Sequence, residues 1–129
     1  MSDEVMDKYI VIIDDSPTIR RSVELILQGE GFSIQQAVNG REAILKIDQI
    51  RNEGNDIALC ISDINMPVLN GFEFLDELRK IDKFTPVVML TTEKEQAKIQ
   101  KGKTSGAAGW MVKPFHPEEL LKVVRRFVR

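Results

Sequence analysis

The chain has 129 residues, of which 43% are hydrophobic and 29% are charged, and its net charge is -2. This length predicts one globular domain spanning 1–129, with its core over residues 8–128 and no room for a DNA-binding output domain. The near balance of 18 basic and 20 acidic residues argues against a basic nucleic-acid binder, and a single cysteine excludes an internal disulfide.

No Cys/His cluster is available for zinc, no apolar run is long enough to span a membrane, and the polar, acidic N-terminus does not read as a signal peptide. We therefore expect a soluble, cytoplasmic protein, a monomer, with no nucleic-acid or membrane partner.

Five short runs rich in β-branched residues predict strands. They are Tyr9–Ile13, Phe32–Val38, Ile57–Ser62, Val87–Leu90 and Trp110–Val112. The first, third and fourth runs are almost wholly apolar, which is typical of strands buried on both faces of a parallel sheet. The second run carries Gln35 and Gln36, so we expect it at an edge of the sheet.

Helical periodicity appears between these runs, with apolar residues three or four positions apart. The stripes are Ile19/Val23/Ile26/Leu27, Ala43/Ile44/Ile47/Ile50, Phe74/Leu75/Leu78/Ile81 and Leu120/Leu121/Val124/Phe127/Val128. A further helix over Glu93–Gly106 has few apolar residues and an internal glycine, so it is expected to be the least secure element. The last helix opens at His116-Pro117, where His116 fits a capping position.

Alternating strands and helices predict an α/β fold, a doubly wound parallel sheet of five strands with five helices. The flavodoxin-like strand order 2-1-3-4-5 is the expected solution, although periodicity alone does not prove it.

Ligands bind such sheets beyond the carboxyl ends of the strands. The first strand ends in Asp14-Asp15, the third in Asp63, the fourth in Thr91 and the fifth in Lys113. In the order 2-1-3-4-5 the first and third strands are neighbours, so the three carboxylates converge. Close carboxylates repel one another unless a positive group lies among them, and Mg²⁺ with oxygen ligands suits such a site.

These residues resemble a known family. Asp14-Asp15, Asp63 within SDINMPVLNG, Thr91 after VVML and Lys113-Pro114-Phe115 look like the receiver domain of two-component response regulators. The resemblance runs from about Lys8 to Val128, and it is strongest to single-domain chemotaxis regulators of the CheY type.

The resemblance implies a role for each matching residue. Asp63 is implied to accept a phosphoryl group from a histidine kinase, with Thr91 and Lys113 contacting the phosphoryl oxygens. Mg²⁺ is implied to be bound by Asp15 and Asp63, by the backbone carbonyl of Asn65, and by Asp14 through water. A cis peptide bond is implied at Lys113–Pro114.

The resemblance also implies a switch. Thr91 and Trp110 are its expected residues, acting on a surface formed by the fourth helix, fifth strand and fifth helix. Asn65 and Glu93 are expected to tune dephosphorylation. Trp110 departs from the family, which usually has tyrosine or phenylalanine at this position. The resemblance implies no separate enzymatic substrate, and it implies a histidine kinase as donor and an output partner such as a flagellar motor switch or a phosphotransferase.

Three alternatives remain open. A phosphorelay intermediate, which passes the phosphoryl group to a histidine phosphotransferase, is compatible with the same residues. A dehalogenase-like phosphatase needs a second aspartate two residues after the nucleophile, where this chain has Asn65. A flavodoxin-like cofactor carrier needs a phosphate-binding loop after the first strand, where Asp14 and Asp15 repel a phosphate.

Other residues have simpler interpretations. Cys60 is expected to be a buried, inert thiol. Gly71 is expected to serve only a turn before the third helix. A group of lysines on the fourth helix is either a solvated face or part of a partner-binding surface; they are Lys94, Lys98, Lys101 and Lys103.

Overall fold

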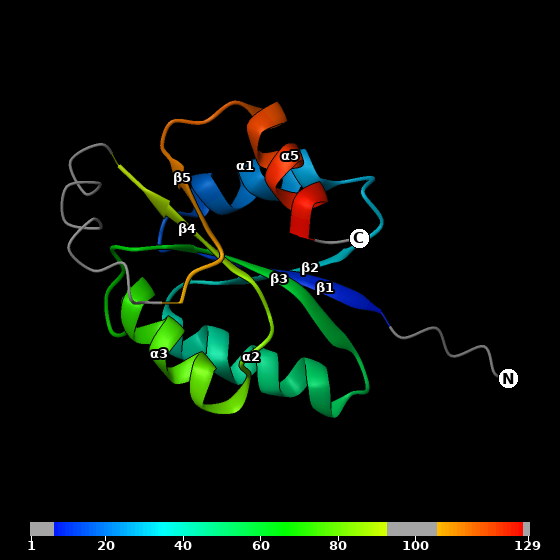
Figure 1. The fold of residues 1–129 in the computed structure, drawn as a ribbon, viewed down its shortest axis with the longest axis vertical. Helices are drawn as coiled ribbons and strands as arrows, with labels where there is room; N and C mark the ends of the chain where they lie inside the picture. The colour runs from blue at the N-terminus through cyan, green and yellow to red at the C-terminus, as the bar shows by residue number, and fades with distance from the viewer. Residues whose placement is uncertain (1–6, 93–105, 128–129) are drawn as a thin grey trace, which may run out of the picture.

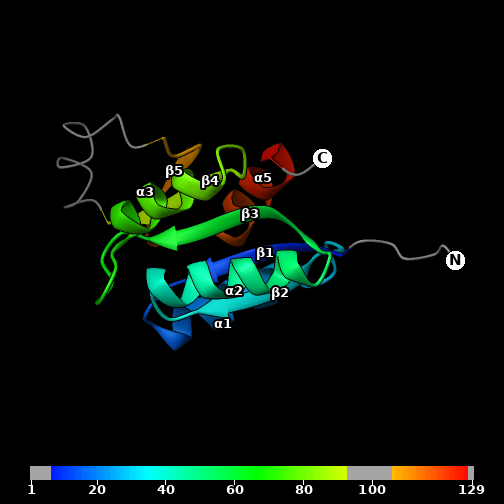
Figure 2. The same cartoon turned by 90° about the horizontal axis from the view of Figure 1, so that it is seen from below.

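The structure is a computed structural model that describes residues 7–92 and 106–127. Its centre is a sheet of five parallel strands (Figure 1). Their order is β2-β1-β3-β4-β5, which confirms the predicted order and places β2 at an edge (Figure 2). The strands are β1 (Lys8–Ile13), β2 (Ser33–Ala37), β3 (Asp56–Asp63), β4 (Val87–Thr91) and β5 (Gly109–Val112).

Helices cover both faces of this sheet. Within the described ranges they are α1 (Pro17–Leu27), α2 (Gly40–Asn52), α3 (Gly71–Ile81) and α5 (Pro117–Phe127). Figures 1 and 2 show α1 and α5 on one face and α2 and α3 on the other. The helix predicted over Glu93–Gly106 lies outside the described residues, apart from Gly106, and so do its four lysines and the final apolar residue Val128.

The two faces of the sheet share each strand residue by residue. In β1, Val11 and Ile13 pack among the residues of the α2/α3 face, while Ile10 and Ile12 pack on the α1/α5 face. All four side chains are fully buried. Because successive strand residues point to opposite faces, burial on both sides produces an uninterrupted apolar run. This explains why β1 could be predicted from composition alone.

Side-chain caps fix where the helices begin. The Ser16 hydroxyl accepts the backbone N–H of Ile19 at the start of α1, and Asn70 forms a reciprocal capping box with Glu73 at the start of α3. At α5 the backbone N–H of His116 donates to the Glu119 carboxylate, so His116 occupies the capping position that the sequence predicted. Each helix therefore starts directly after a strand-end loop.

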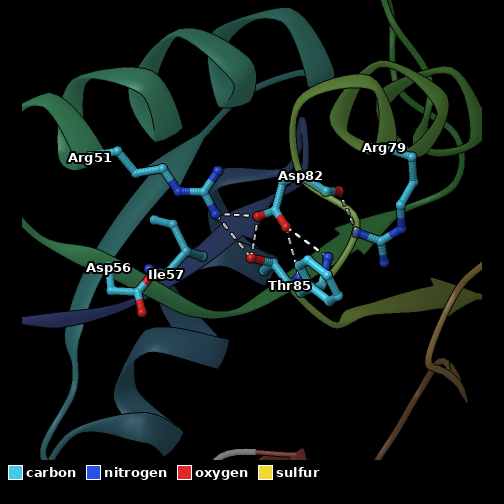
Figure 3. A network of polar contacts seen from close by, with 7 residues as sticks. Arg51, Asp56, Ile57, Arg79, Asp82 and Thr85 are labelled. Carbon is cyan, nitrogen blue, oxygen red and sulfur yellow. Dashed lines mark hydrogen bonds and ion pairs between the residues drawn. The ribbon is translucent and has the colours of Figure 1, made fainter.

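A polar network joins α2, α3 and the loop before β4 at the end of the sheet where the strands begin (Figure 3). The Asp82 carboxylate accepts hydrogen bonds from the backbone N–H groups of Phe84 and Thr85, from the Thr85 hydroxyl and from the Arg51 guanidinium. Arg79 donates to the Asp82 carbonyl. These bonds connect the last turn of α2 to the loop between α3 and β4.

Cys60 is fully buried in β3, and this burial raises the pKa of its thiol to about 12, which keeps the sulfur protonated at neutral pH.

Among the helices of residues 7–92 and 106–127, none is long and apolar enough to cross a membrane.

Candidate functional site

Strand register brings the acidic residues together. In β1 and β3, Ile13 pairs with Ser62, so the next residues, Asp14 and Asp63, lie side by side at the carboxyl edge of the sheet. The nearest carboxylate oxygens of Asp14, Asp15 and Asp63 all lie within 4.8 Å of one another. Asp14 is 1% exposed and Asp63 is 7% exposed, whereas Asp15 is open to solvent. The predicted convergence of the three carboxylates is therefore confirmed.

Backbone groups orient the two buried carboxylates. Asp14 Oδ1 accepts the backbone N–H of Ser16 at 2.9 Å, and Asp63 Oδ1 accepts the backbone N–H of Ile64 at 2.9 Å. The backbone N–H of Asp14 also donates to the Ala37 carbonyl of β2 at 3.1 Å. The acids are thus held by the start of the loops that follow β1 and β3, not only by the sheet.

The Lys113 ammonium lies between these acids. Its Nζ is 3.2 Å from Asp14 Oδ2 and 3.3 Å from Asp63 Oδ1. The backbone N–H of Lys113 donates to the Thr91 carbonyl at 2.7 Å, and the Lys113–Pro114 peptide bond is cis, as the resemblance implied. The chain therefore supplies its own positive charge to the acid cluster.

The charges and the burial shift the pKa values of this pair. Burial acts to raise the pKa of Asp63, and the neighbouring Asp14 carboxylate raises it further. The Lys113 ammonium acts to lower it, but the net pKa of Asp63 lies above the ordinary value. Burial acts to lower the pKa of Lys113, but the carboxylates of Asp14 and Asp63 outweigh it and the net pKa is raised. Lys113 is therefore charged at neutral pH.

The remaining site residues lie on the same edge. Thr91 is fully buried at the end of β4, between β3, which ends in Asp63, and β5, which Lys113 follows. Its hydroxyl donates to the Thr92 carbonyl at 3.2 Å. Asn65 is exposed two residues after Asp63. Glu93, expected to tune dephosphorylation, lies outside the described residues.

Trp110 lies on β5, three residues before Lys113, and is half-buried. Its ring is tilted by 47° against the ring of Phe72 on α3, with 6.1 Å between the ring centres. Trp110 therefore contacts the helix that begins at the end of the Asp63 loop.

Gly71 has a structural duty that the sequence did not indicate. A Cβ atom there would lie 2.4 Å from the Asp63 carbonyl oxygen and 2.9 Å from the Ile64 Cα. The Gly71 backbone N–H donates to the Ile64 carbonyl at 2.8 Å. Only glycine allows this approach, which closes the loop after Asp63 against its own strand. Gly71 therefore lies at the turn before α3, as expected, and steric crowding by the Asp63 backbone requires a glycine there.

The donor set suits a hard divalent cation. Such ions take oxygen ligands, and Mg²⁺ combines one or two carboxylates with water and phosphate oxygens. The three converging carboxylates provide the oxygens, and the exposure of Asp15 leaves room for water. The acid cluster of this chain therefore fits Mg²⁺.

A doubly wound 2-1-3-4-5 sheet with an acid triad, a threonine and a lysine at its carboxyl edge defines a receiver domain. Residues 10–125 match the family described as the response regulator receiver domain. The chain belongs to this family, the receiver modules of two-component systems.

Solved structures and curated proteins agree with this assignment. The chain is similar to the chemotaxis response regulator CheY4 of Vibrio cholerae, with 45% identity, a TM-score of 0.82, and coverage of 96% of this chain and all of that one. It is 36% identical to the transcriptional regulatory protein SrrA of Staphylococcus aureus, over 96% of this chain and 49% of that protein. It is 35% identical to the transcriptional regulatory protein TrcR of Mycobacterium tuberculosis, over 93% of this chain and 45% of that protein. The chain spans about half the length of the curated relatives it matches.

Proposed function

We propose that this protein is a phosphorylation-controlled switch in which Asp63 accepts a phosphoryl group from a histidine kinase with the help of Mg²⁺. The observation that carries this proposal is the position of the Lys113 ammonium, within 3.3 Å of both Asp14 and Asp63 at the carboxyl edge of the sheet. A nucleophilic carboxylate beside a cation and a cation-binding acid cluster is what phosphoryl transfer needs, since positioning and charge neutralisation dominate that reaction.

In the proposed step, a carboxylate oxygen of Asp63 forms a bond to phosphorus as the bond from phosphorus to the kinase histidine breaks. The electron pair of that bond returns to the imidazole nitrogen. Lys113 pairs with one phosphoryl oxygen and Thr91 donates a hydrogen bond to another. Asp15, Asp63 and the Asn65 carbonyl would hold Mg²⁺ directly and Asp14 would hold it through water. The bound ion supplies further positive charge to the phosphoryl oxygens.

The chain acts in this proposal as a signalling protein and not as an enzyme with a separate substrate. Its only chemistry is gain and loss of its own phosphoryl group, for which Asn65 and Glu93 are the proposed tuning residues. The proposed output is a change of partner binding by the protein as a monomer.

Phosphorylation by a small donor tests the proposal. With acetyl phosphate and Mg²⁺, the intact mass should rise by one phosphoryl group, and the gain should vanish on chelation of Mg²⁺ or in Asp63→Asn. Asp76→Asn, an exposed aspartate on α3, is the matched control and should label like the wild type. Full labelling of Asp63→Asn would overturn the assignment.

The switch is proposed to use Thr91 and Trp110. Phosphate on Asp63 draws the Thr91 hydroxyl toward it, and Trp110 repacks beside β4. Its contact with Phe72 supports this coupling, because Phe72 follows Gly71, which touches the Asp63 backbone. Trp110 is the only tryptophan of the chain. Mg²⁺ with beryllofluoride should change its emission and acrylamide quenching, and Thr91→Ala should suppress the change; identical emission in both states would contradict the role of Trp110.

The output partner is proposed to belong to chemotaxis, such as a flagellar motor switch protein. The similarity to CheY4 supports this, because it covers the whole length of a chemotaxis protein. The second candidate is a phosphorelay with a histidine phosphotransferase. Binding of the phosphorylated protein to a motor-switch peptide, compared with transfer of its phosphoryl group to a phosphotransferase, separates the two.

A further inference from the structure

Arg20 is not part of the acid cluster, but it donates a hydrogen bond to the backbone of Asp14. The Arg20 Nη1 of α1 donates to the Asp14 carbonyl oxygen at 2.6 Å. That carbonyl belongs to the peptide group joining Asp14 to Asp15, both of which contribute to the acid cluster. Because β1 ends at Ile13, this peptide lies just beyond the strand. Arg20 therefore restrains the backbone from which Asp15 projects.

The Arg20 guanidinium is itself held by Gln36 and, through it, by Glu24. Arg20 Nε donates to Gln36 Oε1 at 2.9 Å, and Gln36 Nε2 donates to the Glu24 carboxylate. Arg20 and Glu24 are four residues apart on α1, so the Gln36 amide of β2 lies between two side chains of one helix face. Its oxygen faces the cation and its nitrogen faces the anion, which fixes both the amide and the guanidinium.

We propose that Arg20, held by Gln36 and Glu24, is a positioning residue that orients the Asp14–Asp15 peptide for divalent-cation binding. This inference rests on the proposed metal site and extends it to residues for which the sequence predicted no role at the site. A metal ligand binds well only when the residues hydrogen-bonded to it fix its orientation. Loss of such a neighbouring residue typically weakens metal affinity by about 10- to 100-fold. Gln36, predicted only as a mark of an edge strand, becomes part of the site.

The sign of the effect separates positioning from simple electrostatics. Arg20 is a cation near a cation site, so if it acted only through its charge, its neutralisation would strengthen metal binding. If it positions the peptide, neutralisation weakens binding. Arg20→Lys keeps the charge, but lysine lacks the planar guanidinium that donates to the Asp14 carbonyl and to Gln36 at once. This substitution should therefore also weaken metal binding.

Mn²⁺ alone is the probe, with the free ion counted by electron paramagnetic resonance. Arg20→Gln should raise the Kd for Mn²⁺ by about tenfold, and Arg20→Lys and Gln36→Met should each raise it by a smaller factor. Arg21→Gln removes the same charge from the exposed neighbouring residue and is the matched control, with a Kd within about twofold of the wild type. Circular dichroism without metal selects a temperature at which every variant is folded.

Two outcomes count against different claims. If Arg20→Gln binds Mn²⁺ as tightly as the wild type or more tightly, the positioning role is overturned while the metal site stands. If the wild type itself does not bind Mn²⁺, the proposed metal site fails and the role of Arg20 falls with it.

Discussion

Gly71 is a single residue on which the shape of the loop after Asp63 depends. It starts α3, and its missing side chain lets the helix approach the end of β3, where the Asp63 carbonyl and Ile64 Cα lie within 3 Å of a would-be Cβ. Val68, three residues earlier in the same loop, has a positive φ of 70°, an unusual conformation for a β-branched residue. The loop after Asp63 is therefore tightly specified at both points.

Gly71→Ala should destabilise the protein and disturb the site. The new methyl group must push against backbone atoms, so the free energy of unfolding should fall by about 1–3 kcal/mol, the usual cost of overpacking. Gly109→Ala is the matched control, because its Cβ would make only ordinary contacts, with the side chains of Phe127 and Val88, the nearest at 3.5 Å. Urea denaturation measures both, and equal stability of the two variants would contradict the crowding at Gly71.

The link between α2 and α3 depends on Asp82 at the end remote from the site. Its carboxylate accepts hydrogen bonds from Thr85, Phe84 and Arg51, and Arg51 also donates to the Thr85 hydroxyl at 3.0 Å (Figure 3). Burial acts to raise the pKa of Asp82, but the bonds from Thr85, Arg51 and Phe84 outweigh it and hold its pKa far below the ordinary value of 3.8.

Asp82→Asn should therefore cost stability in a pH-dependent way. A lowered pKa in the folded state gives stability that is present above the unfolded pKa and is lost as the pH falls. Asp82→Asn should lose about 2 kcal/mol at pH 7, the scale of bonds to a charged group. The gap from wild type should shrink below about pH 4. Urea unfolding at several pH values tests this, with Asp76→Asn at an exposed position of α3 as the matched control; a gap independent of pH would contradict the ionised network.

The elements show what sequence patterns can and cannot predict. Apolar runs located β1, β3 and β4 because these strands are buried on both faces, and β-branched residues located β2 and β5, which are only partly buried. Hydrophobicity missed polar first residues that join the ladder, such as Lys8 and Asp56, and it overextended β2, which is Ser33–Ala37. Convergence of the acids followed from strand ends and strand order. The bonds of Arg20 to Asp14 and Gln36 were not predictable, since they join residues whose contact depends on the folded backbone.

At the scale of the whole molecule, the fold gathers charges from three strands onto one edge. Asp14 after β1, Asp63 at the end of β3 and Lys113 after β5 meet there, although 99 residues separate the first from the last. The ammonium offsets repulsion between the two buried carboxylates when no metal is bound. A divalent cation bound there would add to an acid cluster that already holds one internal positive charge.

Lys113→Met should make the fold depend on Mg²⁺. Without metal, two buried carboxylates lose their partner, and the free energy of unfolding should fall by about 3 kcal/mol. Mg²⁺ binds only the folded site, so at 100-fold over Kd it should return about 2.7 kcal/mol. Thermal unfolding with and without Mg²⁺ measures this, with the exposed Lys122→Met as control. If Mg²⁺ did not change the thermal stability of Lys113→Met, this result would contradict a site shared by Lys113 and the metal.

Borohydride trapping after phosphorylation locates the phosphoryl group on the chain most directly. Reduction of an aspartyl phosphate converts that aspartate to homoserine, which peptide mass spectrometry can assign to one position. After treatment with acetyl phosphate and Mg²⁺, we expect homoserine at position 63 alone, and none when Mg²⁺ is withheld. Homoserine at Asp14 or Asp15, or no conversion in protein that is shown to be folded, would contradict the account.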